Sequence, residues 1–204
     1  MRKIAVLSQK GGAGKTTLAI HLAVAASGSG ERVVLIDTDP QQSASVWGRS
    51  RSKPDPVVAT VAAPDLGRVF EAAKSEGMTL ALIDTAPHAA PSASQIAGSA
   101  DLALLPVRPS VLDVAAAAAM VRIIQAAKVP ASFVLSACPP RAYEIQEARE
   151  ALAVYGFPVA PVEIIERRSY ARAIAAGAGV TEYEDPRAAA ETQDLWSWLI
   201  KEVL

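Results

Sequence analysis

The sequence predicts an α/β fold with a mostly parallel, twisted sheet and helices on both of its faces. Short apolar runs alternate along the chain with longer segments of helical spacing, a rhythm typical of parallel strands joined by crossover helices. Hydrophobic residues make up 51% of the 204 residues and aromatic residues only 5%, which indicates an aliphatic core that lets helices pack closely on a sheet. The length fits a single domain over residues 1–204.

The runs rich in leucine, isoleucine and valine predict the strands. The first, KIAVLS, opens the chain, and the next two, RVVLID and LALIDT, each carry an aspartate at the end. A proline-bounded segment over residues 54–64 is expected to hold one edge strand, because proline is tolerated at a sheet edge. Apart from this edge strand, the predicted strands, with the three just named first, span residues 3–8, 32–37, 80–85, 102–107, 132–137 and 159–164.

The segments between these runs have the apolar spacing of three and four that predicts helices. The last one, ETQDLWSWLIKEVL, carries a single lysine, Lys201, beside acidic residues. This favours packing onto the sheet over a basic membrane-binding tail, with Trp198 exposed and unexplained. The predicted helices span residues 15–27, 43–52, 65–76, 92–98, 111–127, 142–155, 167–176 and 187–204.

Composition excludes several classes of protein. The net charge of −1 argues against a strongly basic nucleic-acid binder, although it leaves room for a local basic patch. The single cysteine, Cys138, excludes an intrachain disulfide and a cysteine metal cluster, and it is expected to be a buried small hydrophobe. No signal peptide or membrane span fits, so a cytoplasmic protein is expected. His21 and His88 are expected at the surface or in packing.

A glycine-rich segment, SQKGGAGKTT, follows the first strand and opens the first helix. It predicts a phosphate-binding loop, in a variant form because Gln9 stands where the first glycine is expected. Glycines let backbone N–H groups face a phosphate, and the helix N-terminus adds its positive dipole end. A glycine-rich turn that binds nothing is the alternative. The residues predicted to bind nucleotide are Gly11, Gly12, Ala13, Gly14, Lys15, Thr16 and Thr17.

Three residues of this loop are expected to have distinct roles. Lys15 would reach the β- and γ-phosphates, and the Thr16 hydroxyl would ligate Mg²⁺. Thr17, one residue further on, can donate to the α-phosphate.

Three aspartates follow two of the predicted strands. Asp37 and Asp39 stand just beyond one strand and Asp84 just beyond another, so all three are expected at the sheet edge that carries the glycine loop. Asp84 is predicted to hold Mg²⁺ or its waters, Asp37 to support the metal site from behind, and Asp39 to orient the water that attacks the γ-phosphate. Each aspartate could instead only cap a turn, but their convergence beside the loop favours function.

Taken together, these motifs resemble the ParA/MinD family, the deviant Walker A ATPases, and the small ParA-type partition proteins in particular. The resemblance implies a P-loop NTPase that uses ATP and Mg²⁺. It rests on QKGGAGKTT, DTDPQQS, LIDTAP, PVRPS and EYEDPR, at residues 9–17, 37–43, 82–87, 106–110 and 182–187.

The resemblance implies a role for Lys10, a second lysine that a phosphate loop does not itself need. The family's lysine at this position reaches across a dimer to the phosphates bound by the other subunit. Such a cation would neutralise charge between two anionic sites, much as an arginine finger does. From the residue alone, a solvated lysine before a turn is equally compatible. The residues predicted to act in catalysis are thus Lys10, Lys15 and Asp39.

The resemblance also places two surface regions. It implies that PVRPS, with Pro109, lies near the adenine and the dimer face. The segment ERRSYARAIAAG is similar to one that contributes to sequence-independent DNA binding by ParA-type dimers, so Arg167, Arg168 and Arg172 are expected to contact DNA phosphates. A solvated helix face is the alternative.

The expected function is therefore that of a partition ATPase with weak intrinsic hydrolysis. It would form a homodimer on ATP, bind DNA nonspecifically at the nucleoid, and be released when a centromere-binding, ParB-like adaptor stimulates hydrolysis; no membrane partner is expected. A positioning ATPase for another cargo or surface, such as a membrane or a protein cluster, is the first alternative. A metabolic P-loop enzyme is less favoured, because the sequence has no cysteine pair for an iron–sulfur cluster.

Overall fold

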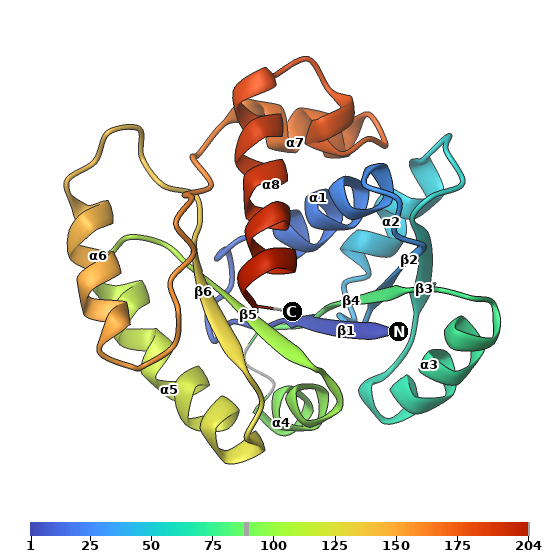
Figure 1. Ribbon diagram of the computed structural model, residues 1–204, viewed down its shortest axis with the longest axis horizontal. Coiled ribbons are helices and arrows are strands. Elements are labelled where there is room, and N and C mark those ends of the chain that lie inside the picture. Colours follow the sequence, from blue (N-terminus) through green and yellow to red (C-terminus); the bar gives the residue numbers. More distant parts are fainter. Residues whose placement is uncertain (88–89, 204) are drawn as a thin grey trace.

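Six parallel strands form one sheet at the centre of the molecule, in the order β3-β2-β4-β1-β5-β6 (Figure 1). The computed structural model describes residues 1–87 and 90–203. Every neighbouring pair of strands is parallel, which confirms the predicted sheet. The strands are β1 (Arg2–Val6), β2 (Val33–Asp37), β3 (Val57–Thr60), β4 (Leu80–Asp84), β5 (Leu102–Val107) and β6 (Ala131–Leu135).

Helices cover both faces of the sheet, and each face has its own aliphatic core. Alternate residues of a strand point to opposite faces, so Leu35 packs with Leu22 and Leu195 on one face while Ile36 packs with Ile124 on the other. The first face carries α1 (Lys15–Gly28), α2 (Ser43–Ser50), α7 (Arg168–Ala175) and α8 (Pro186–Trp198); the second carries α3 (Leu66–Ser75), α4 (Ala90–Ser99), α5 (Val111–Ala127) and α6 (Glu144–Ala153) (Figure 1).

Three short helical turns complete these elements: η1 (Ala63–Asp65), η2 (Val180–Glu182) and η3 (Leu199–Val203). Among the described residues, no helix combines the length and the apolar character needed to cross a membrane.

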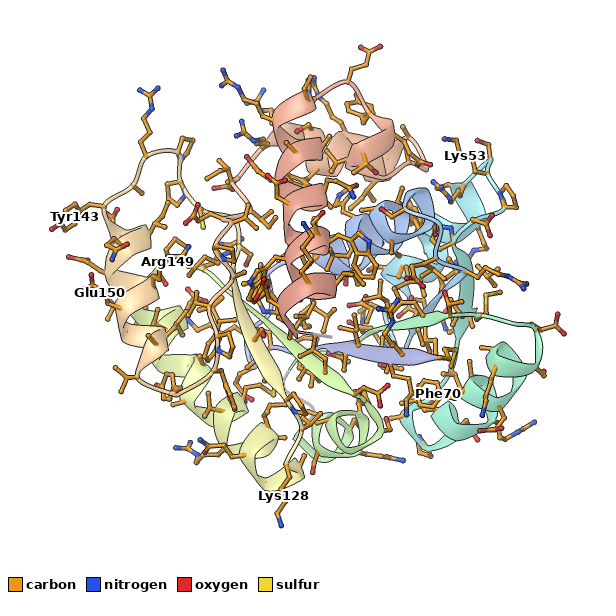
Figure 2. The ribbon with its side chains drawn as sticks, viewed as in Figure 1. Lys53, Phe70, Lys128, Tyr143, Arg149 and Glu150 are labelled. Atoms are coloured by element: carbon orange, nitrogen blue, oxygen red, sulfur yellow. The ribbon has the colours of Figure 1, made fainter. Side chains whose placement is uncertain are left out.

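The strand predicted over residues 159–164 is wrong. This segment, all of which the structure describes, makes only isolated bridges near its two ends, beside β6 and the loop after it. Pro161 lies in its middle and has no N–H to donate, so a regular ladder cannot continue through it. The segment is held by separate backbone hydrogen bonds to β6, such as that from the amide of Ala160 to the carbonyl of Phe133 at 2.8 Å. Arg149, which Figure 2 labels on α6, also donates to the carbonyl of Ala160, at 2.6 Å.

The C-terminal helix packs on the sheet as predicted. Leu195 and Trp196 of α8 are buried in the core of the first face. Trp198, which the sequence left exposed, is partly buried and packs against the same core, so that expectation is corrected. Cys138 is buried, as predicted. His88, one of the two histidines singled out above, lies outside the described residues.

His21 fastens α1 to the C-terminal part of the chain, which confirms a packing role. Its side chain is buried, and Nδ1 accepts a hydrogen bond from the amide of Val180 at 2.9 Å. The ring meets Tyr170 edge-on, with the ring centroids 5.0 Å apart. Burial lowers the pKa of the imidazole to about 4, so the folded protein keeps His21 neutral.

The register of the sheet gathers three strand ends in one row. Val6 at the end of β1 pairs with Asp84 at the end of β4, and Asp84 pairs with Asp37 at the end of β2. The glycine loop leaves the sheet directly after β1, so the aspartates and the loop share one edge, as predicted. In parallel sheets, this carboxyl edge is where ligands bind.

Replacing His21 with asparagine, whose side-chain oxygen can still accept from Val180, should remove an acid-dependent loss of stability. The folded pKa near 4 lies below the ordinary 6.5, so the unfolded chain binds the proton first. The free energy of unfolding of the wild type should then fall by about 3 kcal/mol as the pH drops from about 6.5 to about 4. Urea unfolding of both proteins across this range measures the difference; parallel pH profiles would contradict the assignment.

Candidate nucleotide-binding site

The loop between β1 and α1 has the backbone shape of a phosphate cradle. Gly12 and Gly14 have φ angles of 76° and 86°, in the left-handed region that strains any residue with a side chain. Gly14 caps α1, and its carbonyl accepts the amide of Leu18 at 2.8 Å. Because the first amides of a helix have no partner within it, they and the helix dipole favour an anion at this end.

Lys15, the first residue of α1, is only 6% exposed. Its Nζ lies 3.4 Å from the backbone carbonyl of Lys10, on the loop itself. Burial lowers the pKa of the Lys15 ammonium, and the negative charges of Asp84 and Asp39 oppose that shift. A cation desolvated in this way gains from a bound anion, which is the environment expected of a phosphate-binding lysine.

Asp84 is a buried carboxylate whose two oxygens have no hydrogen-bond partner among the described residues. Burial raises the pKa of this carboxyl to about 7; the nearby Thr16 hydroxyl and Lys15 ammonium oppose the shift. Buried polar groups in folded proteins are almost always paired, and an unpaired carboxylate is more costly still. The arrangement therefore points to a ligand for Asp84.

Asp37 and Asp39 both have partners within the chain. Asp37 is buried, and its Oδ2 accepts from the amide and the hydroxyl of Ser45 at 2.8 and 2.9 Å, while Oδ1 accepts from the amide of Asp39 at 3.1 Å. It therefore anchors the start of α2 and stands behind the site. Asp39 is half-buried and accepts from the amide of Gln41 at 2.9 Å. Its charge still acts on both Lys15 and Asp84, so it lies close to the site.

These residues fit a magnesium ion that a bound nucleotide would share. Within the described part of the chain, no three acidic, histidine or cysteine side chains form a ready-made metal cluster. Mg²⁺ in nucleotide sites usually has few protein ligands and several phosphate or water ligands. The unpaired oxygens of Asp84 and the hydroxyl of Thr16 are the groups that would hold it, and Asp37 would contribute through its charge from behind.

Lys10 lies at the rim of the site and pairs with Asp113. Its Nζ is 3.5 Å from Oδ1 of Asp113, in the first turn of α5, and its side chain is 37% exposed. The sequence predicted either a solvated lysine or a lysine that acts in another subunit. It could not indicate this partner, because Lys10 and Asp113 are far apart in sequence.

A cavity of about 500 Å³ adjoins the phosphate cradle. Gly12, Gly14 and Thr17 line it on the loop side, and Arg108 and Tyr170 line it elsewhere. A volume of this size can take a nucleoside, and its position next to the cradle makes it the candidate base and ribose pocket.

Pro109 does not line this cavity, and its place by the base stays a prediction. It is buried in the hollow between α5 and α6. The neighbouring Arg108 lines the cavity, and its guanidinium comes within 4.0 Å of where a side chain at Gly12 would stand. The residue of the PVRPS motif that lines this cavity and approaches the glycine loop is thus its arginine.

The three arginines proposed for DNA contact have different surroundings. Arg168 and Arg172 of α7 are exposed. Arg167 caps the start of α7, and its guanidinium pairs with Glu191 of α8 at 2.6 Å. The hydrogen bond to Glu191 raises the pKa of Arg167, and the carboxylate of Glu191 neutralises part of the arginine's charge within the fold.

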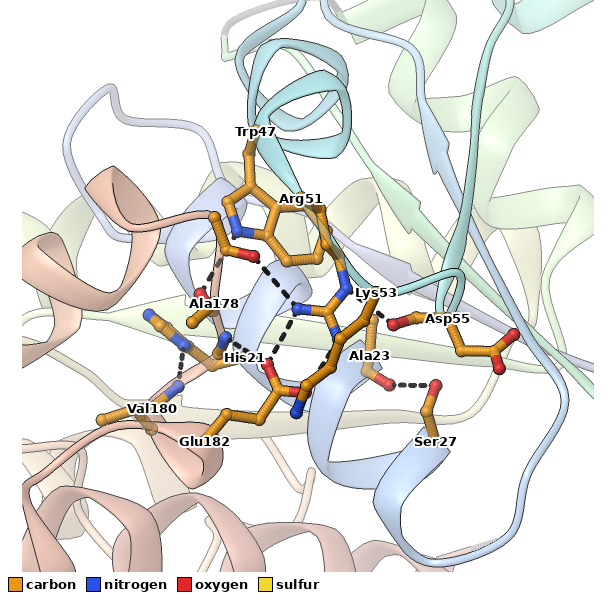
Figure 3. A network of polar contacts seen from close by, with 12 residues as sticks. His21, Ala23, Ser27, Trp47, Arg51, Lys53, Asp55, Ala178, Val180 and Glu182 are labelled. Carbon is orange, nitrogen blue, oxygen red and sulfur yellow. Dashed lines mark hydrogen bonds and ion pairs between the residues drawn. The ribbon is translucent and has the colours of Figure 1, made fainter.

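A polar network joins the region after the aspartates to the EYEDPR motif (Figure 3). Arg51, just past α2, makes two bonds of 2.8 Å to the carboxylate of Glu182 and stacks over Trp47, 5.2 Å from the ring centroid. The Trp47 indole donates to the carbonyl of Ala178 at 3.2 Å. Although burial opposes it, hydrogen bonds from Arg51, the amide of Gly179 and other donors lower the pKa of Glu182 to about 2. The start of this motif is therefore structural.

Residues 4–180 match the CobQ/CobB/MinD/ParA nucleotide binding domain. The chain belongs to this family. It is 31% identical over 194 residues to maintenance of carboxysome distribution protein A from Gloeobacter kilaueensis, which covers 92% of this chain and 87% of that protein. It is 26% identical over 180 residues to protein ParA from Rhizobium radiobacter, which covers 83% and 81%.

Among solved structures, the fold is similar to the septum site-determining protein MinD from Pyrococcus horikoshii complexed with Mg-ADP. The TM-score is 0.79 at 18% identity, over 98% of this chain and 96% of that one. The predicted resemblance to the ParA/MinD ATPases is thus confirmed in sequence and fold, and ParA-type partition proteins are among the relatives.

Replacing Asp84 with asparagine should stabilise the nucleotide-free protein and weaken Mg²⁺-dependent nucleotide binding. The folded pKa near 7 lies above the ordinary 3.8, so the wild type loses stability as the pH rises from about 4 to about 7. Asparagine does not ionise, so at pH 8 the free energy of unfolding of the Asp84→Asn protein should exceed that of the wild type by about 1–3 kcal/mol. Thermal unfolding at pH 5 and pH 8, with and without Mg-nucleotide, measures both effects.

The exposed Asp194 of α8 supplies the control. Asp194→Asn should change neither stability nor Mg²⁺ dependence. An Asp84→Asn protein that is less stable than the wild type at pH 8 would show that the carboxylate is satisfied in the folded chain.

Proposed function

We propose that this ParA/MinD-family chain is a Mg²⁺-dependent ATPase with weak intrinsic hydrolysis, which dimerises on ATP and acts in DNA partition. The observation that carries the proposal is the convergence at one sheet edge of a glycine cradle, the buried ammonium of Lys15 and the unpaired carboxylate of Asp84. The family supports a nucleotide as the ligand, and the Mg-ADP complex of the MinD relative supports the pairing of nucleotide with magnesium.

Within one subunit, the chain's own groups bind and orient the triphosphate. The cradle amides of residues 11–14 and the start of α1 face the β-phosphate, Lys15 reaches the β- and γ-phosphates, and Thr17 donates to the α-phosphate. Thr16 and Asp84 would hold Mg²⁺, which would neutralise part of the phosphate charge. Asp39, close to both charged groups, orients the attacking water.

Lys10 completes the site of a second copy of the chain. Its side chain starts from the loop rim and is partly exposed, so it can extend away from its own cradle. Two triphosphates facing each other would repel, and a lysine from each subunit placed between them would lower that repulsion. This role accounts for the second lysine in the loop.

DNA binding is assigned to α7 of the ATP-bound dimer. Arg168 and Arg172 are four residues apart on this helix and both exposed, so they form one basic face, and Arg167 supports its start through Glu191. A dimer doubles these cations, and phosphate contacts need no base sequence. Release would follow hydrolysis stimulated by a centromere-binding, ParB-like adaptor, and the protein would associate with the nucleoid.

A second candidate function is the positioning of a protein assembly in place of a DNA cargo. The observation that favours it is the similarity to a carboxysome distribution protein over 92% of this chain. The nucleotide switch would be the same in both cases, and only the surface or adaptor would differ.

Lys15→Ala should lower ATP affinity by on the order of a hundredfold, because the phosphates lose their main cation. Lys10→Ala should bind ATP nearly as well but fail to dimerise and hydrolyse, because Lys10 acts on the other subunit. Nucleotide titration together with light scattering separates the two effects. Lys74→Ala, at an exposed lysine of α3, is the control and should behave as the wild type. Normal dimerisation by Lys10→Ala would exclude the role in the other subunit.

Replacing Arg168 and Arg172 with glutamate should abolish DNA binding while ATP-driven dimerisation persists. Four arginines per dimer should give the wild type a slope of about −4 in log affinity against log salt. The measurement is a salt series on duplex DNA with a non-hydrolysable ATP analogue. The control is Arg68→Glu with Lys74→Glu, an equal charge change on α3 at the opposite face of the sheet (Figure 1). DNA binding that does not depend on ATP, or that survives in the α7 variant, would shift the assignment to the second candidate.

A further inference from the structure

The ammonium of Lys10 already has a partner in its own subunit. It pairs with Asp113 at 3.5 Å, and the carboxylate side of this pair is 17% exposed. A pair that is half shielded from water is screened less than one on an open surface. Any movement of Lys10 to another subunit must therefore break a contact that the single chain makes.

Asp113 is held in place by contacts that do not involve Lys10. Ser110 caps α5: its hydroxyl accepts from the amide of Asp113 at 3.2 Å and also contacts the Asp113 carboxylate. The carboxylate stands in the first turn of a 17-residue helix, where the dipole stabilises a negative charge. Little conformational entropy is then lost on the acidic side when the pair forms, so the pair is stronger than one between two free side chains.

The same turn of α5 faces outward. Val111 and Leu112, which precede Asp113, are 84% and 73% exposed, an unusual surface for such apolar residues. On the other side of the pair, the backbone carbonyl of Lys10 lies 3.4 Å from Nζ of the phosphate-binding Lys15. Lys10 thus connects the nucleotide cradle to an apolar turn that a second copy of the chain could cover.

We propose that Asp113 is a positioning residue that retains Lys10 in its own subunit and so sets how readily the ATP-bound dimer forms. The inference rests on the proposed function of Lys10 in the other subunit. A symmetric dimer must break two such pairs. Partly exposed pairs typically contribute 0.2–1 kcal/mol each, which is a factor of about 1.4 to 5 in an equilibrium constant. Losing both pairs should therefore lower the dimer dissociation constant by about twofold to 25-fold.

The decisive comparison uses Asp113→Asn, which removes the charge and keeps the shape. Light scattering or ultracentrifugation with a non-hydrolysable ATP analogue should show a dimer dissociation constant lowered by about twofold to 25-fold. Asp113→Glu keeps a carboxylate for Lys10 and should stay within about twofold of the wild type. Asp101→Asn is the matched control: it removes a pair of the same 3.5 Å length with Lys3, at the opposite ends of the strands.

A second measurement tests the Lys10–Asp113 ion pair independently of dimerisation. Lysine amines are labelled with a small amine-reactive reagent in the absence of nucleotide, and each site is quantified by mass spectrometry. Lys10 should react about 1.4-fold to fivefold faster in Asp113→Asn and unchanged in Asp101→Asn, whereas Lys3 should respond only to Asp101→Asn.

The outcomes separate this inference from the function on which it rests. If the wild type dimerises with ATP but Asp113→Asn is no tighter, Asp113 is only a cap of α5 and the inference falls while the proposed function stands. If Lys10 labelling does not change, the pair does not hold the lysine. If no variant dimerises with ATP, the proposed function fails, and the role of Asp113 fails with it.

Discussion

The burial of two opposite charges, Lys15 and Asp84, at the end of an aliphatic sheet is the constraint on which the site depends. Strands β2 and β4, which carry Asp37 and Asp84, are wholly buried along their length, so the sheet register brings their polar groups together only where these strands end. There, Asp84 has no hydrogen-bond partner among the described residues and Lys15 has only a carbonyl of its own loop. The fold tolerates this cost because the rest of both cores is well packed, and a phosphate with its cation would relieve it.

The second consequence is that the loops beyond the sheet edge must be held by interactions of their own. Asp37 holds the start of α2 through Oδ2 and the loop at Asp39 through Oδ1, and Arg51, just past α2, pairs with Glu182. His21 fixes α1 to the amide of Val180, two residues away from Glu182. Helix α1 and the region that follows the aspartates are therefore both hydrogen-bonded to the chain at or next to η2, which lies close in sequence to α7 (Figure 3). These hydrogen bonds and a short stretch of chain thus connect both ends of the candidate site to the helix that carries Arg168 and Arg172.

The parts of the site that sequence could predict are those in which chemistry and local backbone coincide. Glycines before a lysine at a strand–helix junction, and aspartates at strand ends, determine their own surroundings, so the cradle and the carboxyl edge were predictable. The strand predicted over residues 159–164 was wrong because a hydrophobic composition suits a strand even where Pro161 interrupts the hydrogen-bonded ladder. The PVRPS motif indicates a neighbourhood but not the direction of each side chain, so the sequence could not show that Arg108 lines the candidate cavity and Pro109 does not. The partners of Lys10 and Arg167 are distant in sequence, and only the fold shows that Asp113 and Glu191 reach them.

These internal partners have a common effect on how the protein can work as a switch. Lys10, Lys15 and Arg167 are all cations near the nucleotide cavity, and each has an oxygen acceptor within the chain. A ligand that recruits them must exchange one set of contacts for another, so only the difference between the two appears as binding free energy. For Lys15 the exchange is strongly favourable, because a single carbonyl is replaced by a charged phosphate. For Lys10, in the role proposed above, the exchange would be nearly balanced, because one anion would replace another. With such a balanced exchange, a modest change such as the loss of the γ-phosphate would be enough to reverse the proposed association of two subunits.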